Sequence, residues 1–186
     1  MGSETTDEDL MLRYRNGDVD AFEQLYARHK GGLYRYFLRK CHNENIAEEL
    51  YQDVWIKLIN ARERYEVTAR FTTWLYQLAS NHFIDYYRKN RNSGTASQDD
   101  CDELENIPAP QNQQPEQQLQ LSRQTSTLLQ LIKELPDEQR EVFLLKEEAG
   151  MNLSEIAEVT GVNIETAKSR LRYAVNKLRR GLETYG

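Results

Sequence analysis

Apolar residues recur at the spacing of an α-helix along most of the chain, and no stretch alternates long enough to predict a strand. The helical pattern is interrupted at Asn16-Gly17 and at Pro136, residue types that end or break helices. It predicts eight helices, over 7–16, 18–41, 45–60, 72–90, 119–134, 138–148, 153–160 and 164–182. We therefore expect an all-α protein.

Local signals refine three of these helices. Asn45 with Glu48, and Asn152 with Glu155, have the spacing of a capping box, in which each side chain hydrogen-bonds the other residue's backbone N–H. The adjacent glycines at 31–32 are a weak point in the helix over 18–41, because glycine is a poor helix former.

The last two predicted helices are typical of a helix-turn-helix. A short helix ends at Gly161, and the helix that follows has one apolar stripe at helical spacing. The stripe consists of Ile164, Ala167, Leu171, Ala174, Val175 and Leu178. Between Lys168 and Arg180 there are six cations and no acid. A helix that packs on one side and presents positive charge on the other suits insertion into the major groove of DNA.

Negative charge is concentrated in one segment. The 186-residue chain has a net charge of −6, yet residues 1–93 hold 14 basic and 14 acidic side chains, and residues 121–186 hold 10 of each. Residues 94–120 hold six acids, no cation and three of the four prolines, and they have too few apolar residues to bury a core. The pattern predicts two independent helical domains, 1–93 and 121–186. They are joined by a flexible acidic linker, 94–120, that could stretch to about 90 Å.

The helix over 72–90 combines a polar ridge with many aromatic side chains. Helical spacing places Gln77, Asn81, Asp85 and Arg88 along one face. Asparagine and arginine can hydrogen-bond base edges, and aromatic rings can stack on unpaired bases. Composition alone still favours a place in the core for any single ring. The stretch is therefore a candidate surface for single-stranded DNA.

Apolar runs, the N-terminal sequence and the cysteines indicate where in the cell the protein is located. No run approaches the ~20 apolar residues that cross a bilayer, and the acidic N-terminus is unlike a signal peptide. Cys41 and Cys101 lie far apart, so no disulfide framework is implied. We expect a cytoplasmic protein without stable membrane insertion.

Several stretches carry a resemblance when they are taken in order. They are DAFEQLY at 20–26, AEELYQDVW at 47–55, FTTWLYQLASN at 71–81, DYYR at 85–88, LPDEQREVFL at 135–144, LSEIA at 153–157 and ETAKSRL at 165–171. Each stretch is only moderately specific, but together they resemble the extracytoplasmic-function sigma factors of bacterial RNA polymerase, in the sigma-70 family. The resemblance covers nearly the whole chain except the N-terminal tail and the linker.

The resemblance implies a transcription initiation factor that binds core RNA polymerase, directs it to specific promoters and helps to melt the −10 element. It makes 1–93 sigma region 2 and 121–186 sigma region 4. Docking on the β′ clamp helices is assigned to Gln52, Asp53, Trp55 and Lys57. Recognition of the −10 element is assigned to Tyr65, Arg70, Phe71, Trp74, Asn81, Asp85, Arg88 and Lys89, with the loop 65–70 and Asn81 capturing a flipped-out base. Recognition of the −35 duplex is assigned to Glu165, Thr166, Lys168, Ser169, Arg170, Arg172, Tyr173 and Lys177.

The implied partners are core RNA polymerase, through its β′ clamp helices and β flap, promoter DNA in duplex and single-stranded form, and an anti-sigma factor. No catalytic residue, cofactor or metal is implied. Glu165 departs from the basic character of the recognition helix. At the first turn it favours the helix dipole but repels phosphate, so it either accepts from a cytosine amino group or only caps the helix.

Two other interpretations stay open at this point. A two-domain helix-turn-helix regulator that acts without polymerase docking would use residues 18–91 as an effector or dimerisation domain. A helical enzyme or metal protein would use His29, Cys41, His42 and His82, but their spacing matches no common metal-binding motif. We therefore expect structural histidines.

Overall fold

The computed structural model describes residues 4–94 and 115–185. Within these ranges the chain is helical and contains no strand, as the apolar pattern predicts. The elements are α1 (Asp7–Arg15), α2 (Val19–Cys41), α3 (Glu44–Ala61), the 3₁₀ turn η1 (Arg62–Arg64), α4 (Phe71–Asn92), α5 (Pro115–Lys133), α6 (Asp137–Ala149), α7 (Leu153–Thr160) and α8 (Ile164–Tyr185).

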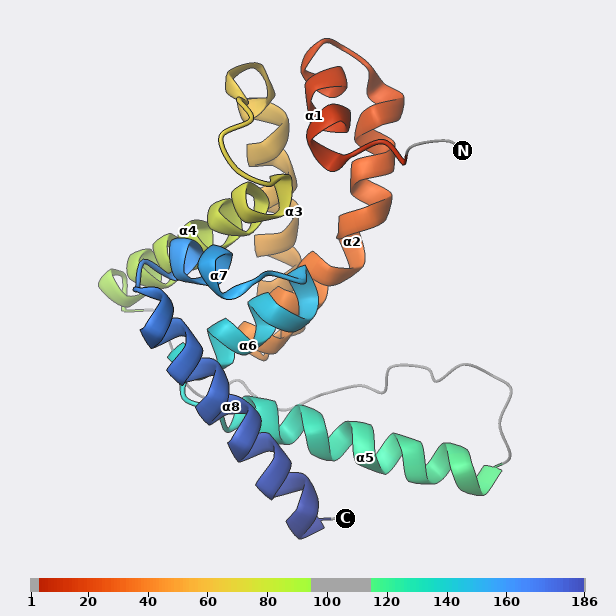
Figure 1. Ribbon diagram of the computed structural model, residues 1–186, viewed down its shortest axis with the longest axis vertical. Coiled ribbons are helices and arrows are strands. Elements are labelled where there is room, and N and C mark those ends of the chain that lie inside the picture. The colour runs from red at the N-terminus through yellow and green to blue at the C-terminus, as the bar shows by residue number, and fades with distance from the viewer. Residues whose placement is uncertain (1–3, 95–114, 186) are drawn as a thin grey trace.

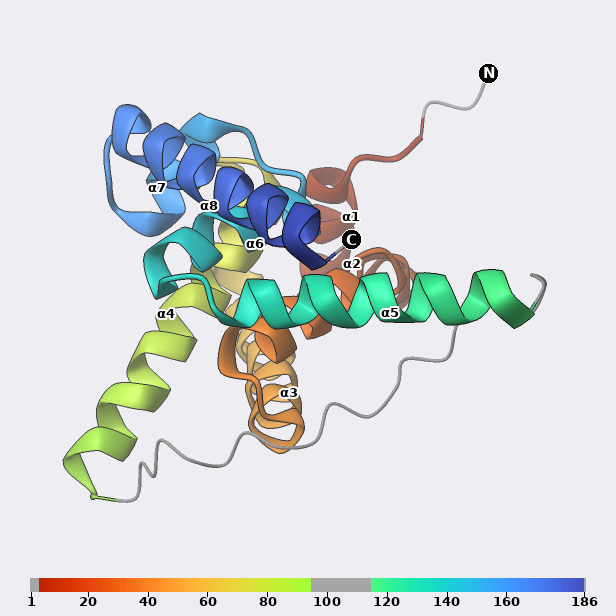
Figure 2. The same ribbon diagram turned by 90° about the horizontal axis from the view of Figure 1, so that it is seen from below.

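The N-terminal half is a bundle of α1 to α4 (Figure 1). Its core is filled by leucines and aromatic rings that are fully buried, because each helix turns one apolar stripe inward. The largest of these side chains are Leu10, Met11, Leu25, Leu33, Tyr36, Phe37, Leu50, Leu58, Phe71, Leu75 and Tyr76. The C-terminal half of α4 and the N-terminal half of α5 extend away from the body in different directions (Figure 2).

The C-terminal half contains α5 to α8, with α7 and α8 forming the predicted helix-turn-helix. Gly161 takes the left-handed conformation, φ 69°, that ends α7. Where α8 crosses α5, a Cβ on Gly181 would lie 2.4 Å from the Leu131 side chain, so a larger residue here would force Leu131 to move. The helix-turn-helix is therefore fixed against α5 as well as against α6.

Of the two capping pairs predicted from the sequence, one is present in the structure and the other is not. The capping box at α7 is confirmed: the Glu155 N–H donates to Asn152 Oδ1, and the Asn152 N–H donates to Glu155 Oε2, both at 2.9 Å. The capping pair predicted at Asn45 is wrong, because Asn43 is the N-cap of α3 and accepts from the Ile46 N–H at 3.0 Å. The left-handed His42 before it, at φ 56°, ends α2 and leaves Asn43 extended.

The linker prediction extends too far at one end. Helix α5 begins at Pro115, so residues 115–120 belong to a helix and not to the linker. Proline is favoured at the first position of a helix, where its missing N–H costs nothing. The stretch 95–114 lies outside the described residues.

The two halves pack against one another in this structure, where the sequence pattern predicts independent units. Helix α6 lies on α2, and α7 lies on α4. In the centre of the contact, Glu141 Oε1 accepts from Tyr36 Oη at 2.8 Å and from Ser80 Oγ at 3.4 Å, while Oε2 forms an ion pair with Lys40. Burial, and next the Glu141 carboxylate, raise the pKa of Tyr36 well above its usual value, which keeps the phenol a donor.

A second carboxylate of α6 extends the same contact. Glu148, two helical turns beyond Glu141, has a side chain that is only 5% exposed and pairs with Arg35 and Arg39 of α2. The Arg35 Nε–H donates to its Oε2 at 2.9 Å. One face of α6 thus places two carboxylates on a basic ridge of α2, and each buried charge has a partner.

Gly32 allows this contact to form. The expected weak point in α2 is not seen, since the helix runs unbroken through Gly31 and Gly32. A Cβ on Gly32 would lie 2.9 Å from the Glu148 carbonyl oxygen and 3.2 Å from Tyr76 Oη. A Cβ on Gly31 would meet only the flexible end of Arg35, at 3.0 Å. Gly32 is therefore the position where the backbones of the two halves come close.

His42 lies at the edge of the same contact. Its Nε2 is buried without a hydrogen-bond partner. Burial, together with the charges of Arg140 and Lys133, lowers the pKa of His42 from 6.5 to about 4, and Asp137 opposes the shift. The folded protein therefore holds this imidazole neutral.

We expect Gly31→Ala to stabilise the protein and Gly32→Ala not to. Each replacement removes a glycine from a helix, a gain of roughly 1 kcal/mol, or about 3 °C in melting temperature. Only Gly32→Ala presses on the backbone of α6, so it should lose this gain and enlarge the radius of gyration measured by X-ray scattering. Equal melting temperatures and equal radii for the two variants would contradict this account of Gly32.

We also expect His42 to make stability depend on pH. The unfolded chain binds a proton on this imidazole below pH ~6.5, whereas the folded chain does not bind it until pH ~4. The free energy of unfolding should therefore fall as the pH drops from 6.5 towards 4. Replacing His42 with asparagine, which tolerates the left-handed conformation, should remove that part of the loss. Urea midpoints at several pH values test this, and parallel curves for the two proteins would refute it.

Candidate nucleic-acid interface

The outer face of α3 holds three of the four residues predicted to dock on a polymerase. Gln52 and Lys57 are exposed, and the half-exposed Asp53 carboxylate lies 3.0 Å from His82 Nε2 of α4. Trp55, in contrast, is only 5% exposed and packs edge-on against the Tyr26 ring, with the ring centres 5.0 Å apart. Trp55 therefore supports the helix from below and does not lie on its outer face.

Ile56 is a residue of this face that the sequence analysis missed. It is 54% exposed and lies one turn from Gln52 and Asp53. The sequence contained a signal for its exposure, because Ile56 falls outside the apolar stripe of α3 that contains Leu50, Val54 and Leu58. The outer face of α3 thus combines one apolar side chain with polar and charged ones.

The loop between η1 and α4 is a short exposed segment on a buried base. Its residues 66–68 are exposed and turn tightly, with the Thr68 N–H donating to the Glu66 carbonyl oxygen at 3.0 Å. Tyr65 and Phe71, at the two ends of the loop, are buried in the core. Burial, and next the Glu8 carboxylate, raise the pKa of Tyr65 to about 12. Tyr65 and Phe71 were predicted to contact DNA, but here they form the base of the loop.

The predicted polar ridge of α4 reaches solvent in part. Asn81, Asp85 and Arg88 are exposed, and so is the neighbouring Lys89, whereas Gln77 is half-buried. Trp74, one turn into the helix, is half-buried and meets the Tyr65 ring edge-on, with the ring centres 5.1 Å apart. The ridge therefore begins beside the loop and presents amide, acid and base groups in succession.

On α8 most residues predicted to bind duplex DNA are exposed. Lys168, Arg172 and Tyr173 are exposed, and the Arg172 guanidinium lies 5.3 Å from the centre of the Tyr173 ring. Lys177 is also exposed, but its Nζ donates to the Glu134 carbonyl oxygen at 3.1 Å. Arg170 instead forms an ion pair with Glu138 of α6 at 2.9 Å. The outer face of α8 is thus basic, while Arg170 also ties this helix to α6.

The start of α8 bears on the two roles considered for Glu165. Asn163 Oδ1 accepts from the Thr166 N–H at 2.8 Å and so caps the helix. Glu165 is exposed. Thr166 and Ser169 are half-buried. Since another residue caps α8, the Glu165 carboxylate is available for a partner outside the chain.

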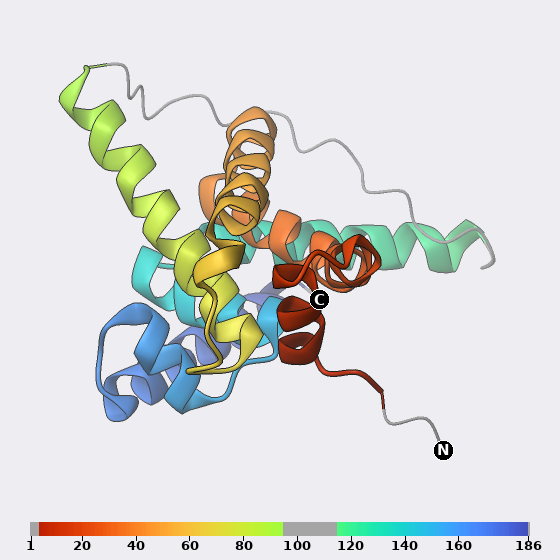
Figure 3. The ribbon, with the colours of Figure 1, turned by 90° about the horizontal axis from the view of Figure 1, so that it is seen from above.

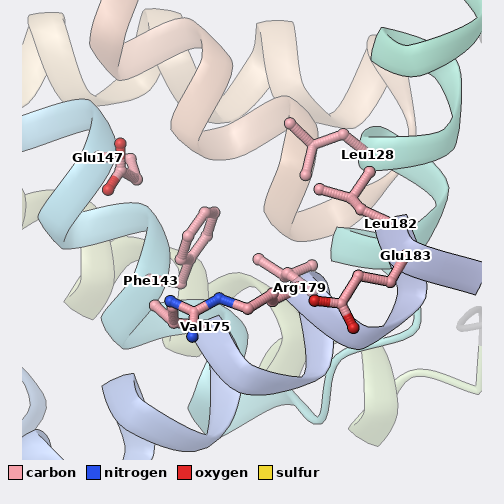
Figure 4. Close-up of a pocket in the computed structure, with 8 residues that line it drawn as sticks. Leu128, Phe143, Glu147, Val175, Arg179, Leu182 and Glu183 are labelled. Carbon is pink, nitrogen blue, oxygen red and sulfur yellow. The ribbon is translucent and has the colours of Figure 1, made fainter. Parts of the chain in front are cut away.

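The C-terminal half also has an open, mainly apolar groove between α5, α6 and α8 (Figure 4). The aliphatic and aromatic part of its lining comes from Leu128, Phe143, Val175, Leu178 and Leu182. Glu147, Arg179 and Glu183 supply charged side chains at the same groove. The groove is therefore an exposed apolar surface on the half that contains the helix-turn-helix.

The loop and the start of α4 lie against α7 (Figure 3). Arg70 Nη1 is 3.4 Å from Glu155 Oε1, and Gln77 Nε2 donates to the Val159 carbonyl oxygen at 3.4 Å. Arg70 remains largely exposed, so this pair contributes little stability. In this arrangement, part of the surface predicted for single-stranded DNA is covered by the helix-turn-helix.

Two of the three histidines considered as metal ligands, His29 and His82, contact carboxylates. His29 Nε2 lies 2.7 Å from Asp7 Oδ2, and His82 contacts Asp53. The Cys41 thiol donates to the Asn43 carbonyl oxygen at 3.4 Å. Within 4–94 and 115–185, no three His, Cys, Asp or Glu side chains gather as metal ligands would. No helix in these ranges is long and apolar enough to cross a membrane.

Comparison with known proteins gives two family matches. Residues 25–93 match the model of sigma-70 region 2, and residues 126–178 match that of sigma-70 region 4. The RNA polymerase sigma factor CarQ of Myxococcus xanthus is 32% identical over 170 residues, which cover 91% of this chain and 93% of CarQ. The ECF RNA polymerase sigma factor SigW of Bacillus subtilis is 28% identical over 173 residues, which cover 90% of this chain and 92% of SigW.

Two solved structures share the fold. CnrH, in complex with the cytosolic domain of CnrY, superposes with a TM-score of 0.66 at 24% identity, covering 97% of this chain and 99% of CnrH. The sigma factor RpoE of Bartonella quintana, in complex with the anti-sigma factor NepR, gives a TM-score of 0.70 at 23% identity, covering 87% of this chain and 96% of RpoE. At these identities, the likeness concerns the fold alone.

Proposed function

The chain belongs to the extracytoplasmic-function group of the sigma-70 family of RNA polymerase sigma factors, and we propose how its surfaces divide the work of transcription initiation. As a member of that group, it is an initiation factor that directs RNA polymerase to specific promoters. The observation that supports the division is the separation of an exposed polar ridge on α4 from an exposed basic face on α8.

Docking on the β′ clamp helices falls to the outer face of α3. Gln52, Asp53 and Lys57 offer polar contacts there, and Ile56 adds an apolar one. The Asp53–His82 contact links this face to α4, so docking and DNA binding share a rigid support. The β flap is a second contact, for which the groove on the C-terminal half offers an exposed apolar surface.

Capture of the −10 element falls to the exposed loop residues and the ridge of α4. A base that leaves the duplex loses a few kcal/mol of pairing and stacking, which contacts in a pocket must offset. Asn81 supplies both a donor and an acceptor for a base edge, and Trp74 is the half-buried ring beside the loop. Arg88 and Lys89 then follow the strand backbone along α4.

Recognition of the −35 element falls to α8. Lys168, Arg172 and Lys177 provide contacts to phosphates or guanines in the major groove. Glu165, which is not the helix cap, is suited to accept from the amino group of a cytosine. No catalytic residue is needed, because the factor works only by binding.

The packing of the two halves must open when both elements are bound. Elements centred at −10 and −35 lie some 25 base pairs apart, or roughly 85 Å along B-DNA. In the structure described above, the two halves are packed together, an arrangement that we call closed. There α4 and α7 touch, and Arg70 contacts Glu155 directly. Docking on the polymerase therefore accompanies separation of the halves.

An anti-sigma factor is a further proposed partner. CnrH and RpoE, which share the fold, were each solved with a bound regulator, the cytosolic domain of CnrY and NepR. A regulator that covered α3 or α8 would silence the factor. We place the protein in the cytoplasm, where the polymerase and the chromosome lie. The alternative function, in which the chain is itself a helix-turn-helix transcriptional regulator that acts without docking on polymerase, is not favoured, because residues 25–93 match sigma-70 region 2.

The test of this function is transcription in vitro. Purified chain and core RNA polymerase are incubated with a promoter library, and the transcripts are sequenced. We expect transcripts from a small set of promoters that share −10 and −35 sequences and that core enzyme alone does not use. Transcription no different from that of core enzyme would refute the proposal.

A more specific prediction concerns Asn81. Asn81→Ala should reduce heparin-resistant open complexes by about tenfold or more, because a base contact is lost. Its affinity for a −35 duplex fragment should stay unchanged. Asn45→Ala, which removes an exposed asparagine of α3 outside the proposed DNA surfaces, is the control. Equal losses in open complexes and in −35 affinity would argue against a role in capture.

A further inference from the structure

Helix α1 contacts both ends of the loop 65–70, although it is more than 45 residues away in sequence. Near its start, Glu8 Oε1 accepts from the Phe71 N–H at 2.7 Å. At its end, Arg15 Nη1 donates to the Tyr65 carbonyl oxygen at 2.9 Å. The backbone on each side of the loop is thus held by a different side chain of one helix.

The bond from Glu8 also completes the start of α4. The first N–H groups of a helix have no partner within the helix, and the N-cap residue Arg70 supplies no side-chain hydrogen bond. A carboxylate at this place takes one of the free donors and also faces the positive end of the helix dipole. Glu8 therefore fixes where α4 begins and so where the loop ends.

The bond from Arg15 fixes the other end. Tyr65 is the residue at which η1 stops and the chain becomes extended, with φ −65° and ψ 128°. Its side chain is buried and its hydroxyl has no hydrogen-bond partner, so the ring is held by packing. The hydrogen bond from Arg15 to the carbonyl oxygen sets the direction in which the loop leaves this anchor.

Helix α1 is itself a firm support. Leu10 and Met11 are fully buried beneath it. Thr6 caps its start by accepting from the Asp9 N–H at 3.2 Å. Asp7 binds Arg28 at 2.8 Å and His29 at 2.7 Å, both on α2. The two contacts to the loop therefore start from a helix that is anchored on α2.

We propose that α1 is a clamp that sets the loop 65–70 in its base-capturing shape, with Glu8 and Arg15 as positioning residues. This inference rests on the −10 role proposed above. If a loop adopts its binding-competent shape only part of the time, its apparent affinity for the base is reduced by that fraction. The clamp raises that fraction before DNA arrives, and it fixes the pocket that distinguishes one base from another.

The test uses holoenzyme reconstituted with core polymerase and two single-stranded probes. One carries the −10 sequence selected in vitro with the wild-type holoenzyme, and the other is identical except for an abasic site at the captured position. The readout is the ratio of the two affinities, which we call base discrimination. A partly unfolded variant lowers the active fraction but leaves this ratio unchanged, so the ratio separates positioning from simple loss of structure.

We expect Glu8→Ala and Arg15→Ala each to reduce base discrimination by about tenfold or more, the effect of losing one charge-assisted hydrogen bond. Glu8→Gln keeps an acceptor oxygen and should restore most of it. Asp9→Ala is the matched control, because it removes an exposed acid from the same first turn of α1. Binding of the −35 duplex and of core polymerase should stay at the wild-type level in all four variants.

Asn81→Ala, measured in parallel, distinguishes the clamp from the function on which it rests. Wild-type discrimination in Glu8→Ala and Arg15→Ala, with a loss in Asn81→Ala, would overturn the clamp and leave the proposed function standing. Wild-type discrimination in all three would overturn both. A loss confined to the two α1 variants would support the clamp and move the capture site from Asn81 to the loop.

Discussion

The buried carboxylate of Glu141 is the contact on which the closed arrangement depends. It brings together α6 of one half with α2 and α4 of the other, through Lys40, Tyr36 and Ser80. An ion pair taken out of water gains little net free energy, because desolvation offsets most of the attraction. When the halves separate, water solvates the charges of Glu141 and Lys40 again, so the ion pair fixes how the halves pack but adds little to the strength of the interface. Such a contact suits an interface that must open, whereas an apolar interface of equal size would resist opening.

The closed arrangement affects the two DNA surfaces unequally. The basic face of α8 is exposed as it stands, whereas Arg70 and Gln77 are engaged by α7. Under the proposed roles, a −35 duplex can therefore be bound without any change of shape, but the −10 strand requires the halves to part. In the proposed mechanism, docking on the polymerase would supply the free energy for opening, and this difference would set the order of events. Premature contact with single-stranded DNA is thereby limited.

Features set by neighbouring residues could be predicted from the sequence, and features set by distant ones could not. The helices and the Asn152–Glu155 capping box depend on spacing within one or two turns, and they are present in the structure. The start of α3 was misplaced because the left-handed His42 shifts the cap to Asn43, and no periodicity signals such a residue. Gly32 looked like a helix weakness, since the backbone that approaches it belongs to residue 148. The contacts of Glu8 and Arg15 with the loop 65–70 could not be predicted for the same reason, since the partners are far apart in sequence.

The aromatic rings show how a correct family can still leave roles open. Tyr65, Phe71 and Trp55 sit in sequence stretches that suggested DNA or polymerase contacts, yet all three are in the core. Burying a large ring stabilises the fold by a few kcal/mol, and that demand fixes these side chains inside. Of the rings assigned to the −10 site, only Trp74 retains partial exposure. Under the proposed −10 role, discrimination between bases would rest mainly on polar groups such as Asn81 and on the shape of a short loop. A loop of that kind needs an external support, which is why residues far from the DNA can control what it recognises.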